Sequence, residues 1–561
     1  MRTTAGTELG SAIVADRELG GTPVTRQVLD ILVAWGVARV YCCPGSTEAA
    51  MLDAFVGRDD IELVLVSHES TAIAAADAEA RLSGGPAVVY VHTNVGLANV
   101  LAHLSAARIA YAPVLILNGL KPSVLAGRDG FTTLPHPDLG LRDLVKWDRV
   151  PATPDSLPAD LERALSIATA EPAGPVWLGL PQELLETTDA VDPRYPRPLP
   201  GPRRTRPSRA ELRGVADALT AATRVVLVSG GEVARHGASD LMVTLAERLD
   251  ATVLHEDRRG FERSSYPTQH PAFQGSYDVR HPAVANADVV VFAGCQVFRE
   301  FDVNGAPALP TTATVVHVHV DPSRIGRLHQ VDHALVGHTG EVVRDLLDAL
   351  GPRPATTPAR APTPASGAGP SLSPHSSPAH HGLAGWVSSV AEALTGEENY
   401  VVDATTAGPA LLGALPQARP DQVLTTSSGS LGWGLGAAIG VALAQPERRV
   451  LAFLGDGVFQ FGLAALWTAQ RYRAQVTFVV LNNEAFAAVG LALGRFGGEA
   501  VRRGDWLGTD LSGPHLAQIA GGFGLPSERV LTPDGVAAAI ERGSRSRGPS
   551  LVELMTSARE E

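Results

Sequence analysis

Two apolar runs near the C-terminal end of the chain, each ending in polar residues, constrain the fold more than any other feature. The run RRVLAFLG ends at Gly455, Asp456 and Gly457, and the run QVTFVVL ends at Asn482 and Asn483. A helical stretch separates them, and Asn483 follows Asp456 by 27 positions, which matches a βαβ unit of roughly 30 residues. Parallel neighbouring strands would bring both side chains to one sheet edge, where ligands of open α/β sheets bind.

The chemistry of these residues predicts a metal–diphosphate site. A carboxylate and an amide oxygen are hard oxygen ligands that suit Mg²⁺ or Ca²⁺ and leave positions for waters and phosphate oxygens. Gly455, Gly457 and Gly462 would let the backbone approach a diphosphate, and the helix start that follows favours anionic oxygens. The alternative is that Asp456 is a turn residue and Asn483 a cap, because Asp-Gly is common in turns. The coincidence of both at strand ends favours the site.

The alternation of short apolar runs and helical stretches continues along most of the 561 residues. It predicts an α/β fold class with three doubly wound parallel-sheet domains. We expect a disordered tail at 1–22, domains at 23–190, 205–351 and 383–561, and a disordered linker at 352–382. The Pro, Ala and Ser content of that linker cannot bury a core. Its two adjacent histidines, His380 and His381, are better explained as part of a solvated segment than as a metal site.

Composition narrows the classes of function. The net charge is −13 and no long basic stretch occurs, which disfavours nucleic-acid binding. The stretch LGWGLGAAIGVALA is too short and too rich in glycine to span a bilayer, and Met1–Gly21 lacks the apolar segment of a secretory signal. Cys42, Cys43 and Cys295 form no disulfide framework, so we expect a reducing, cytoplasmic compartment.

The motif GDG followed by NN at this spacing resembles the metal–diphosphate motif of thiamine-diphosphate (ThDP) enzymes. Further matching segments are CPGSTE, HES, VHTNVGLANVLAHLSAA, YPTQHPAFQG, VFRE, SSGSLGWGLGAAIGVALA and GDGVFQFGLAALWTAQRY. They extend over nearly the whole chain and are most similar to the benzoylformate decarboxylases of that family. The resemblance implies a pyrimidine-binding, a central and a diphosphate-binding domain, with ThDP and Mg²⁺ or Ca²⁺ as cofactors. It also implies active sites between the chains of a homodimer or of a dimer-of-dimers tetramer.

The resemblance also assigns cofactor-binding roles. It implies that Asp456 and Asn483 bind the metal through their side chains and Ala485 through its backbone carbonyl. Glu69 matches the glutamate that hydrogen-bonds the aminopyrimidine ring and promotes formation of the reactive carbanion. The alternative for Glu69 is an acid favoured by the dipole of a helix N-terminus.

Two further positions complete the cofactor pocket that the resemblance implies. Gly429 matches the residue whose carbonyl receives the 4′-amino group of the cofactor. Leu431 matches the bulky residue that forces the cofactor into its bent shape.

The substrate side of the site is implied in the same way. Ser46 matches a serine that touches the substrate carboxylate, and His92 matches a histidine that transfers protons there. The alternatives are a helix N-cap for Ser46 and a core histidine satisfied by backbone for His92. Ala488 and Val489, in the small apolar segment after Asn483, should line the substrate pocket. Phe301 replaces a second active-site histidine, which would dry and narrow the pocket.

These assignments predict decarboxylation of an aromatic or bulky apolar 2-oxo acid through an enamine. The missing histidine at Phe301 leaves open carboligation with an aldehyde or ketone acceptor, as in acetolactate synthase or benzaldehyde lyase. A Rossmann oxidoreductase is disfavoured because CCPGSTE lacks the G-x-G-x-x-G pattern. FAD is disfavoured because VLVSGGEVARHGA has a glycine pair but no fingerprint. The intact Glu69, Asp456 and Asn483 argue against a non-catalytic scaffold.

Overall fold

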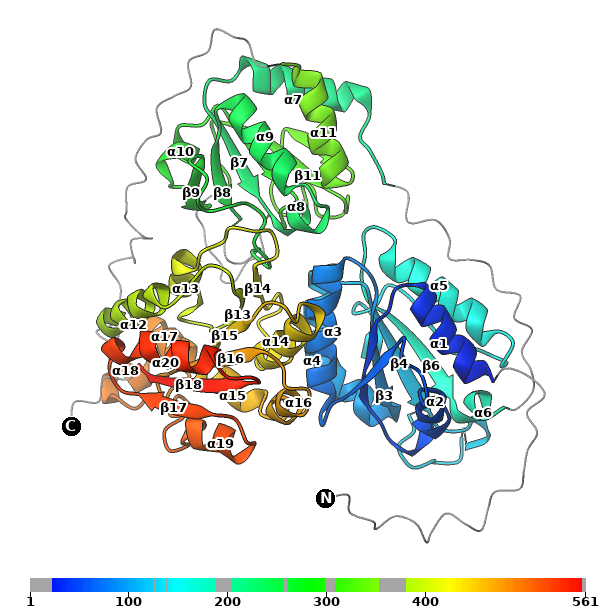
Figure 1. Ribbon diagram of the computed structural model, residues 1–561. Helices are drawn as coiled ribbons and strands as arrows, with labels where there is room; N and C mark the ends of the chain where they lie inside the picture. Colours follow the sequence, from blue (N-terminus) through cyan, green and yellow to red (C-terminus); the bar gives the residue numbers. More distant parts are fainter. Residues whose placement is uncertain are drawn as a thin grey trace, which may run out of the picture.

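The computed structural model describes residues 23–125, 127–134, 136, 140–187, 204–256, 260–297, 308–352 and 380–556. The chain forms three lobes, each built around one sheet, and the central lobe (green in Figure 1) contacts the other two. The predicted tail at 1–22, positions 353–379 of the predicted linker and Phe301 lie outside the described residues, as do the side chains of His380 and His381. The predicted domain boundaries remain a proposal.

The first lobe contains a six-stranded parallel sheet in the order β2-β1-β3-β4-β6-β5. Its strands are β1 (Arg39–Cys43), β2 (Glu62–Leu65), β3 (Ala87–His92), β4 (Val114–Leu120), β5 (Asp148–Arg149) and β6 (Val176–Pro181). Its helices are α1 (Val24–Ala34), η1 (Ser46–Glu48), α2 (Ala49–Ala54), α3 (Glu69–Ser83), α4 (Thr93–Ile109), η2 (Ser123–Leu125), α5 (Leu157–Thr169) and α6 (Gln182–Leu185). Alternate residues of β3 belong to two different apolar clusters, so helices cover both faces of the sheet.

The central lobe repeats this plan with the strand order β12-β11-β10-β7-β8-β9. Its strands are β7 (Val225–Ser229), β8 (Thr252–His255), β9 (Phe273–Ser276), β10 (Val289–Ala293), β11 (Thr314–His319) and β12 (His333–Val336). Its helices are α7 (Arg209–Ala221), α8 (Gly231–Arg235), α9 (Ser239–Leu249), α10 (Pro282–Ala285) and α11 (Thr339–Leu350).

The third lobe has the strand order β14-β13-β15-β16-β18-β17. Its strands are β13 (Asn399–Asp403), β14 (Val423–Thr425), β15 (Val450–Gly455), β16 (Val476–Asn482), β17 (Ser527–Val530) and β18 (Ser550–Met555). Its helices are α12 (His380–Glu392), α13 (Gly408–Ala414), α14 (Trp433–Ala444), α15 (Asp456–Phe461), α16 (Ala465–Arg471), α17 (Ala487–Phe496), α18 (Glu499–Arg503), α19 (Leu516–Gly522), η4 (Pro533–Gly535) and α20 (Val536–Ser544). The predicted α/β class with three doubly wound parallel sheets is confirmed.

In each sheet, strands are added first on one side of the first strand and then on its other side. This change of side falls between β1 and β3, between β7 and β10, and between β13 and β15. Crevices open outside the carboxyl ends of the strands at such switch points, and ligands of open α/β sheets bind there. The topology therefore offers three candidate binding places, one in each lobe.

Helices α3 and α14 join the first lobe to the third and lie side by side in Figure 1. A Cβ atom at Gly436 would meet Ala74 Cβ at 2.7 Å and the Thr71 carbonyl oxygen at 2.9 Å. A Cβ atom at Gly440 would overlap the backbone of Ala75. The small residues of both helices thus let their backbones approach closely, which explains the unusual glycine content of α14.

A buried ion pair within α3 forms hydrogen bonds across the same junction. Arg81 and Asp77 have no exposed side-chain surface and form two hydrogen bonds, of 2.6 and 3.0 Å. Arg81 also donates to the Thr425 carbonyl at 2.8 Å, and Trp433 donates to Asp77 at 2.7 Å. Because loss of either charge would leave the other buried and unpaired, this pair fixes how the two lobes dock.

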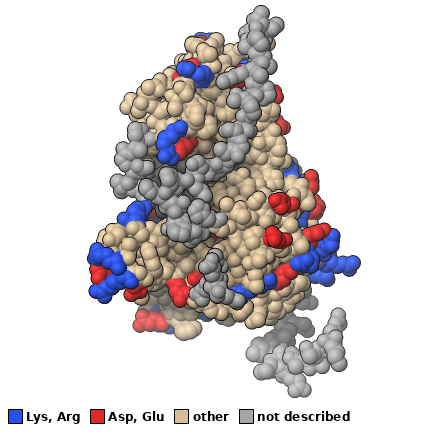
Figure 2. Space-filling model, turned by 90° about the vertical axis from the view of Figure 1, so that its left-hand side faces the viewer, with Lys and Arg blue, Asp and Glu red and all other residues tan. Residues whose placement is uncertain are grey.

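The surface supports the charge argument made from the sequence. On the face shown in Figure 2, acidic and basic side chains are interspersed and no broad area carries one sign. Within the described part of the chain, no helix is both long and apolar enough to cross a membrane.

Candidate active site

The switch point of the third sheet brings acidic and amide side chains together. Asp403 is the last residue of β13, Asp456 follows β15, and Asn482 ends β16. Asp403 pairs in register with Leu454 of β15, and Gly455 pairs with Leu481 of β16. The three strand ends therefore lie side by side at one edge, as the βαβ spacing predicts.

Asp456 is a buried carboxylate that accepts hydrogen bonds from two backbone amides. One oxygen accepts a hydrogen bond from the Gly457 amide at 2.8 Å and the other from the Ala485 amide at 3.2 Å. Burial raises its pKa above the usual range, and these amide hydrogen bonds oppose the shift. No described residue forms an ion pair with it. A bound cation would compensate a carboxylate in this position, so the residue fits the predicted metal ligand.

The two asparagines at the end of β16 differ in whether their side chains are free to face a ligand. Asn482 is buried, and its side chain bonds the Glu553 carboxylate at 2.8 Å and the Glu484 amide at 2.9 Å. Asn483 is half-buried and accepts a hydrogen bond from the Ala485 amide at 3.1 Å. One amide hydrogen thus bridges Asn483 to Asp456. Asn483 is therefore the member of the pair that can face a ligand with Asp456, which fits its predicted role.

The glycines of the predicted diphosphate loop differ in the space around their Cα atoms. A Cβ at Gly455 would meet nothing closer than 3.9 Å, so backbone is accessible at this point. A Cβ at Gly457 would meet the Phe486 ring at 2.7 Å, so that glycine serves internal packing. Gly429 is exposed, has a φ of +72° and faces open space, whereas Leu431 is half-buried against the core. These positions fit a loop and an apolar wedge beside a ligand.

The switch point of the first sheet holds the predicted substrate residues. Ser46 follows β1 and is exposed, and His92 ends β3 with 22% of its side chain exposed. Ser46 does not cap the following helix. The carboxylate of Glu48 instead accepts a hydrogen bond from the Gly45 amide at 2.6 Å, and it also contacts His92. His92 is bonded to side chains rather than to backbone, unlike an ordinary core histidine.

Glu69 lies at the start of α3 and is 8% exposed. Asn99 of α4 donates a hydrogen bond to its carboxylate at 2.9 Å. The thiol of Cys43 also contacts it: burial first, and the charge of Glu69 next, raise the pKa of Cys43 to about 12. Side chains of β1 and α4 thus contact the Glu69 carboxylate. An acid that only interacts favourably with the helix dipole would not need these contacts.

Sequence reasoning missed four residues of these two groups: Glu48, Asn99, Asp403 and Glu553. Asp403 is buried, accepts a hydrogen bond from the Gly434 amide at 2.9 Å, and has a pKa that burial raises to about 7. An acid at the end of a third apolar run, YVVD, was the one available signal. The other three are recognised only by partners distant in sequence.

The chain does not join the two groups into one site. Among the described residues, no hydrogen bond or ion pair connects Glu69 or His92 to Asp456. Ala488 and Val489 of α17 are exposed, and α17 has no buried residue at all. The described part of the single chain therefore leaves the apolar helix that follows Asn483 uncovered.

The switch point of the central sheet is filled by the chain itself. A Cβ at Gly230 would overlap the Gly294 carbonyl, and one at Gly231 would meet Glu262. The Glu232 carboxylate accepts hydrogen bonds from the Val320 amide at 3.1 Å and the Thr339 hydroxyl at 2.8 Å. The glycine pair noted in the sequence therefore serves close packing in the described part of this crevice.

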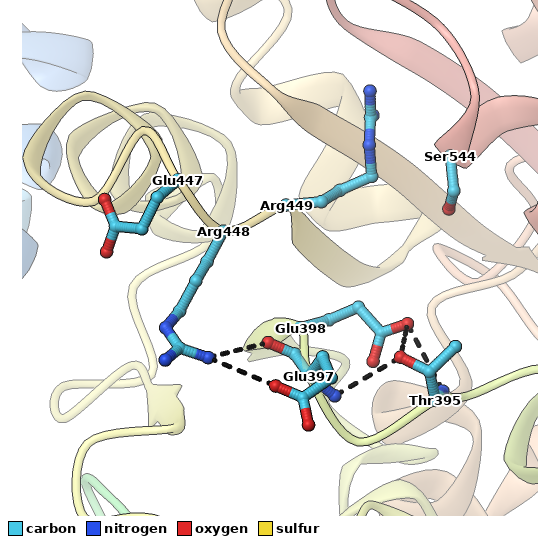
Figure 3. A pocket seen from close by; sticks show the side chains of 7 residues that line it. All are labelled: Thr395, Glu397, Glu398, Glu447, Arg448, Arg449 and Ser544. Atoms are coloured by element: carbon cyan, nitrogen blue, oxygen red, sulfur yellow. Dashed lines mark hydrogen bonds and ion pairs between the residues drawn. The ribbon is translucent and has the colours of Figure 1, made fainter.

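A separate hollow of about 420 Å³ lies in the third lobe but at the opposite edge of the sheet, before the strands β13 and β15 begin. Figure 3 shows its lining residues Thr395, Glu397, Glu398, Glu447, Arg448, Arg449 and Ser544. Arg448 reaches toward Glu397, with contacts of 3.3 and 3.5 Å, and Arg449 points away to Thr477 at 3.0 Å. Both cations are already engaged, so this hollow is not a candidate active site.

Comparison with known proteins decides among the α/β families. Residues 23–139 match the N-terminal TPP binding domain of thiamine pyrophosphate enzymes, residues 212–346 the central domain, and residues 405–554 the C-terminal TPP binding domain. The chain belongs to the thiamine pyrophosphate enzyme family. Thiamine pyrophosphate is ThDP, so the protein is a ThDP-dependent enzyme, and the predicted family and cofactor are confirmed.

Individual relatives span almost the whole chain. Benzoylformate decarboxylase of Pseudomonas aeruginosa is 28% identical over 536 residues, covering 94% of this chain and 97% of that protein. Acetolactate synthase isozyme 1 large subunit of Escherichia coli is 25% identical over 563 residues, covering 96% of each. The crystal structure of benzoylformate decarboxylase from Polynucleobacter necessarius superimposes with a TM-score of 0.82 at 25% identity, covering 95% of this chain and 99% of that one. A relative named as a decarboxylase and a relative named as a synthase thus both match this chain over almost its whole length.

Proposed function

We propose that the protein is a ThDP- and Mg²⁺-dependent decarboxylase of an aromatic or bulky apolar 2-oxo acid. The observation that carries this proposal is the buried Asp456, which no described cationic side chain contacts and which shares the Ala485 amide with Asn483 at the switch point of the third sheet. ThDP, when bound, supplies the electron sink for loss of carbon dioxide. The similarity to benzoylformate decarboxylase over almost the whole chain supports the substrate class.

In this proposal, residues at the switch point of the third sheet bind the metal, and residues at the switch point of the first sheet bind the substrate and transfer protons. Asp456 and Asn483 would hold the metal with their side-chain oxygens, and the Ala485 carbonyl would complete the protein's ligands. Glu69, oriented by Asn99, would exchange a proton with the cofactor ring. At the first switch point, Ser46 would contact the substrate carboxylate and His92 would transfer protons near the substrate.

The functional unit in this proposal is at least a dimer. The single chain leaves the apolar helix α17 uncovered, with Phe496 83% exposed and Leu491 44% exposed. A second copy whose first lobe covers α17 would bring its Glu69 and His92 to the Asp456 group, and the substrate pocket would lie at Ala488 and Val489. Large exposed apolar patches usually mark such interfaces.

The central lobe plays no cofactor role in this proposal. In the described part of its switch point, Gly230 and Gly294 pack closely against neighbouring backbone and the Glu232 carboxylate is bonded to the Val320 amide, which disfavours a nucleotide site there. We therefore infer that the enzyme works without FAD.

Carboligation is the second candidate function. The similarity to acetolactate synthase supports it, and so does Phe301, which replaces a proton-transferring histidine in the sequence comparison. The acceptor would be an aldehyde or a ketone.

One experiment tests both functions. A panel of 2-oxo acids is supplied with ThDP and Mg²⁺, with and without an aldehyde acceptor, and carbon dioxide and 2-hydroxyketone are measured together. We expect carbon dioxide from aromatic or branched acids, and Asp456→Ala should lose both products together with Mg²⁺-dependent ThDP binding in calorimetry. Unchanged ThDP affinity in Asp456→Ala would refute the metal assignment, and ketone without free aldehyde would favour carboligation.

A further inference from the structure

Glu48 is a fully buried carboxylate that no feature of the sequence singles out. It has no exposed surface and lies in the short helix η1 after β1. Its oxygens accept hydrogen bonds from the Gly45 amide at 2.6 Å and the Thr47 hydroxyl at 2.5 Å, and His92 Nδ1 lies 2.9 Å away. All three partners can donate a hydrogen bond to the Glu48 carboxylate oxygens.

The space around this pair is shaped by glycines from two elements. A Cβ atom at Gly119 of β4 would overlap the Glu48 carboxylate, and one at Gly45 would overlap the His92 ring. A side chain at either position would push the carboxylate and the imidazole apart. The contact between Glu48 and His92 is therefore enforced by the packing of β1, β3 and β4 and is not an accident of a flexible surface.

The hydrogen bonds fix which nitrogen of His92 carries the proton. The Thr47 hydroxyl has one hydrogen and donates it to Glu48 Oε1, so toward His92 Nδ1, at 2.9 Å, it can only accept. Glu48 Oε2, the other neighbour of Nδ1, is also an acceptor. Nδ1 must therefore bear the hydrogen. No described residue bonds Nε2, and the side chain keeps 22% of its surface exposed.

We propose that Glu48 is a positioning residue that, with Thr47, fixes the ring and the Nδ1–H tautomer of His92 so that Nε2 exchanges the substrate proton. This inference rests on the proposed function, because it needs His92 to act on the substrate. Glu48 touches neither substrate nor cofactor and acts through His92 alone. A merely structural Glu48, which only caps the turn at Gly45, would make different predictions.

The tautomer can be measured without any activity. The holoenzyme is labelled with ¹⁵N-histidine, and long-range ¹H–¹⁵N spectra are recorded at a pH where the ring is neutral, with His92→Asn identifying the His92 signals. We expect the hydrogen on Nδ1 in the wild type and a mixture of tautomers in Glu48→Gln, which keeps the shape but loses the charge. Hydrogen on Nε2 in the wild type would overturn the proposal.

Kinetics supply the second test. Glu48→Gln should lower kcat by about 10–10²-fold, the usual cost of losing a partner that orients an active-site ligand, with KM within about twofold. The effect should vanish in a His92→Ala background, because a residue that acts through another adds nothing once that residue is gone. Equal losses from Glu48→Gln in both backgrounds would overturn the proposal and leave Glu48 a structural residue.

Controls separate this inference from the proposed function and from misfolding. Glu79→Gln removes a half-buried carboxylate of the same lobe, one that bonds Arg39 and Tyr41, and should leave kcat unchanged. Hydrogen exchange at C2 of bound ThDP should be equal in wild type and Glu48→Gln; its absence in the wild type would refute the proposed function while the tautomer result still stands. If Glu48→Gln does not fold, Thr47→Val, which removes one acceptor from Nδ1, should give a smaller loss of kcat, and no loss would overturn the proposal.

Discussion

Asp403 provides a stability test of the candidate site that needs no substrate. It is a buried acid beside Asp456, its only described hydrogen bond comes from the Gly434 amide, and burial raises its pKa from 3.8 to about 7. Asp403→Asn keeps an oxygen that can accept from Gly434 and removes the charge. We expect the variant to stabilise the third lobe in the cofactor-free protein, but only above a certain pH.

The sign and size follow from the pKa. A carboxyl whose pKa is raised in the folded state contributes stability below its unfolded pKa, near 4, and loses it progressively until the pH reaches about 7. A shift of about three units corresponds to a ceiling of about 4 kcal/mol, at about 1.4 kcal/mol per unit. The variant should therefore match the wild type near pH 4 and exceed its free energy of unfolding by about 2–4 kcal/mol at pH 8.

The assay is thermal unfolding of the two proteins across pH 4–8, without ThDP or metal. A gain of 2–4 kcal/mol corresponds to roughly 5–15 °C for a unit of 150–250 residues. Asp348→Asn, in which an exposed acid of the central lobe is neutralised, is the matched control and should show no such trend. A gain that is constant over the pH range, or a loss at pH 8, would refute the reasoning that Asp403 is an uncompensated buried acid.

Three further predictions concern the activating acid, the lobe junction and the pocket. Glu69→Gln should bind ThDP normally but slow C2 hydrogen exchange by about 10²–10⁴-fold; wild-type exchange would show that Glu69 is not the activating acid. Gly440→Ala should destabilise the protein by about 1–3 kcal/mol or more, because the new methyl group meets the backbone of Ala75. The control Gly382→Ala places its methyl group in open space and should be tolerated. Equal unfolding midpoints of the two variants would contradict the close packing of α3 and α14. Phe301→His should shift products from 2-hydroxyketone toward free aldehyde, since it adds a group whose unperturbed pKa near 6.5 suits proton transfer; an unchanged product ratio would limit Phe301 to shaping the pocket.

The parts of the site that follow from local pattern could be predicted from sequence. Apolar runs of strand length, each followed by a helical stretch, fix the parallel sheets, because strands buried on both faces need continuous apolar residues. The same pattern places Asp456 and Asn483 at strand ends. The sequence alone does not show why Asn483, and not Asn482, can face a ligand. Asn482 is the last residue of β16 and its side chain is bonded to Glu553, which lies 71 positions after it.

The supporting residues could not be predicted in this way. Glu48 contacts His92 across 44 positions, and Asn99 contacts Glu69 across 30. These partners meet because the crossovers between β1, β3 and β4 bring their ends together, and nothing in the local composition distinguishes them from ordinary helix residues. Each of these contacts supplies a hydrogen bond to a buried carboxylate, and this partnership is recognised only in the structure.

The three switch points show that fold alone does not determine function here. All three are six-stranded parallel sheets with a switch point, yet the buried carboxylates in their crevices have different partners. In the central lobe Glu232 is bonded within the chain and near Arg235, and in the first lobe Glu48 and Glu69 are met by donors from neighbouring elements. In the third lobe, the described hydrogen bonds of Asp403 and Asp456 come from backbone amides alone, and no described cationic side chain contacts either carboxylate. We therefore expect a charge-compensating ligand in that crevice, with the first lobe presenting the predicted proton-transferring groups to it.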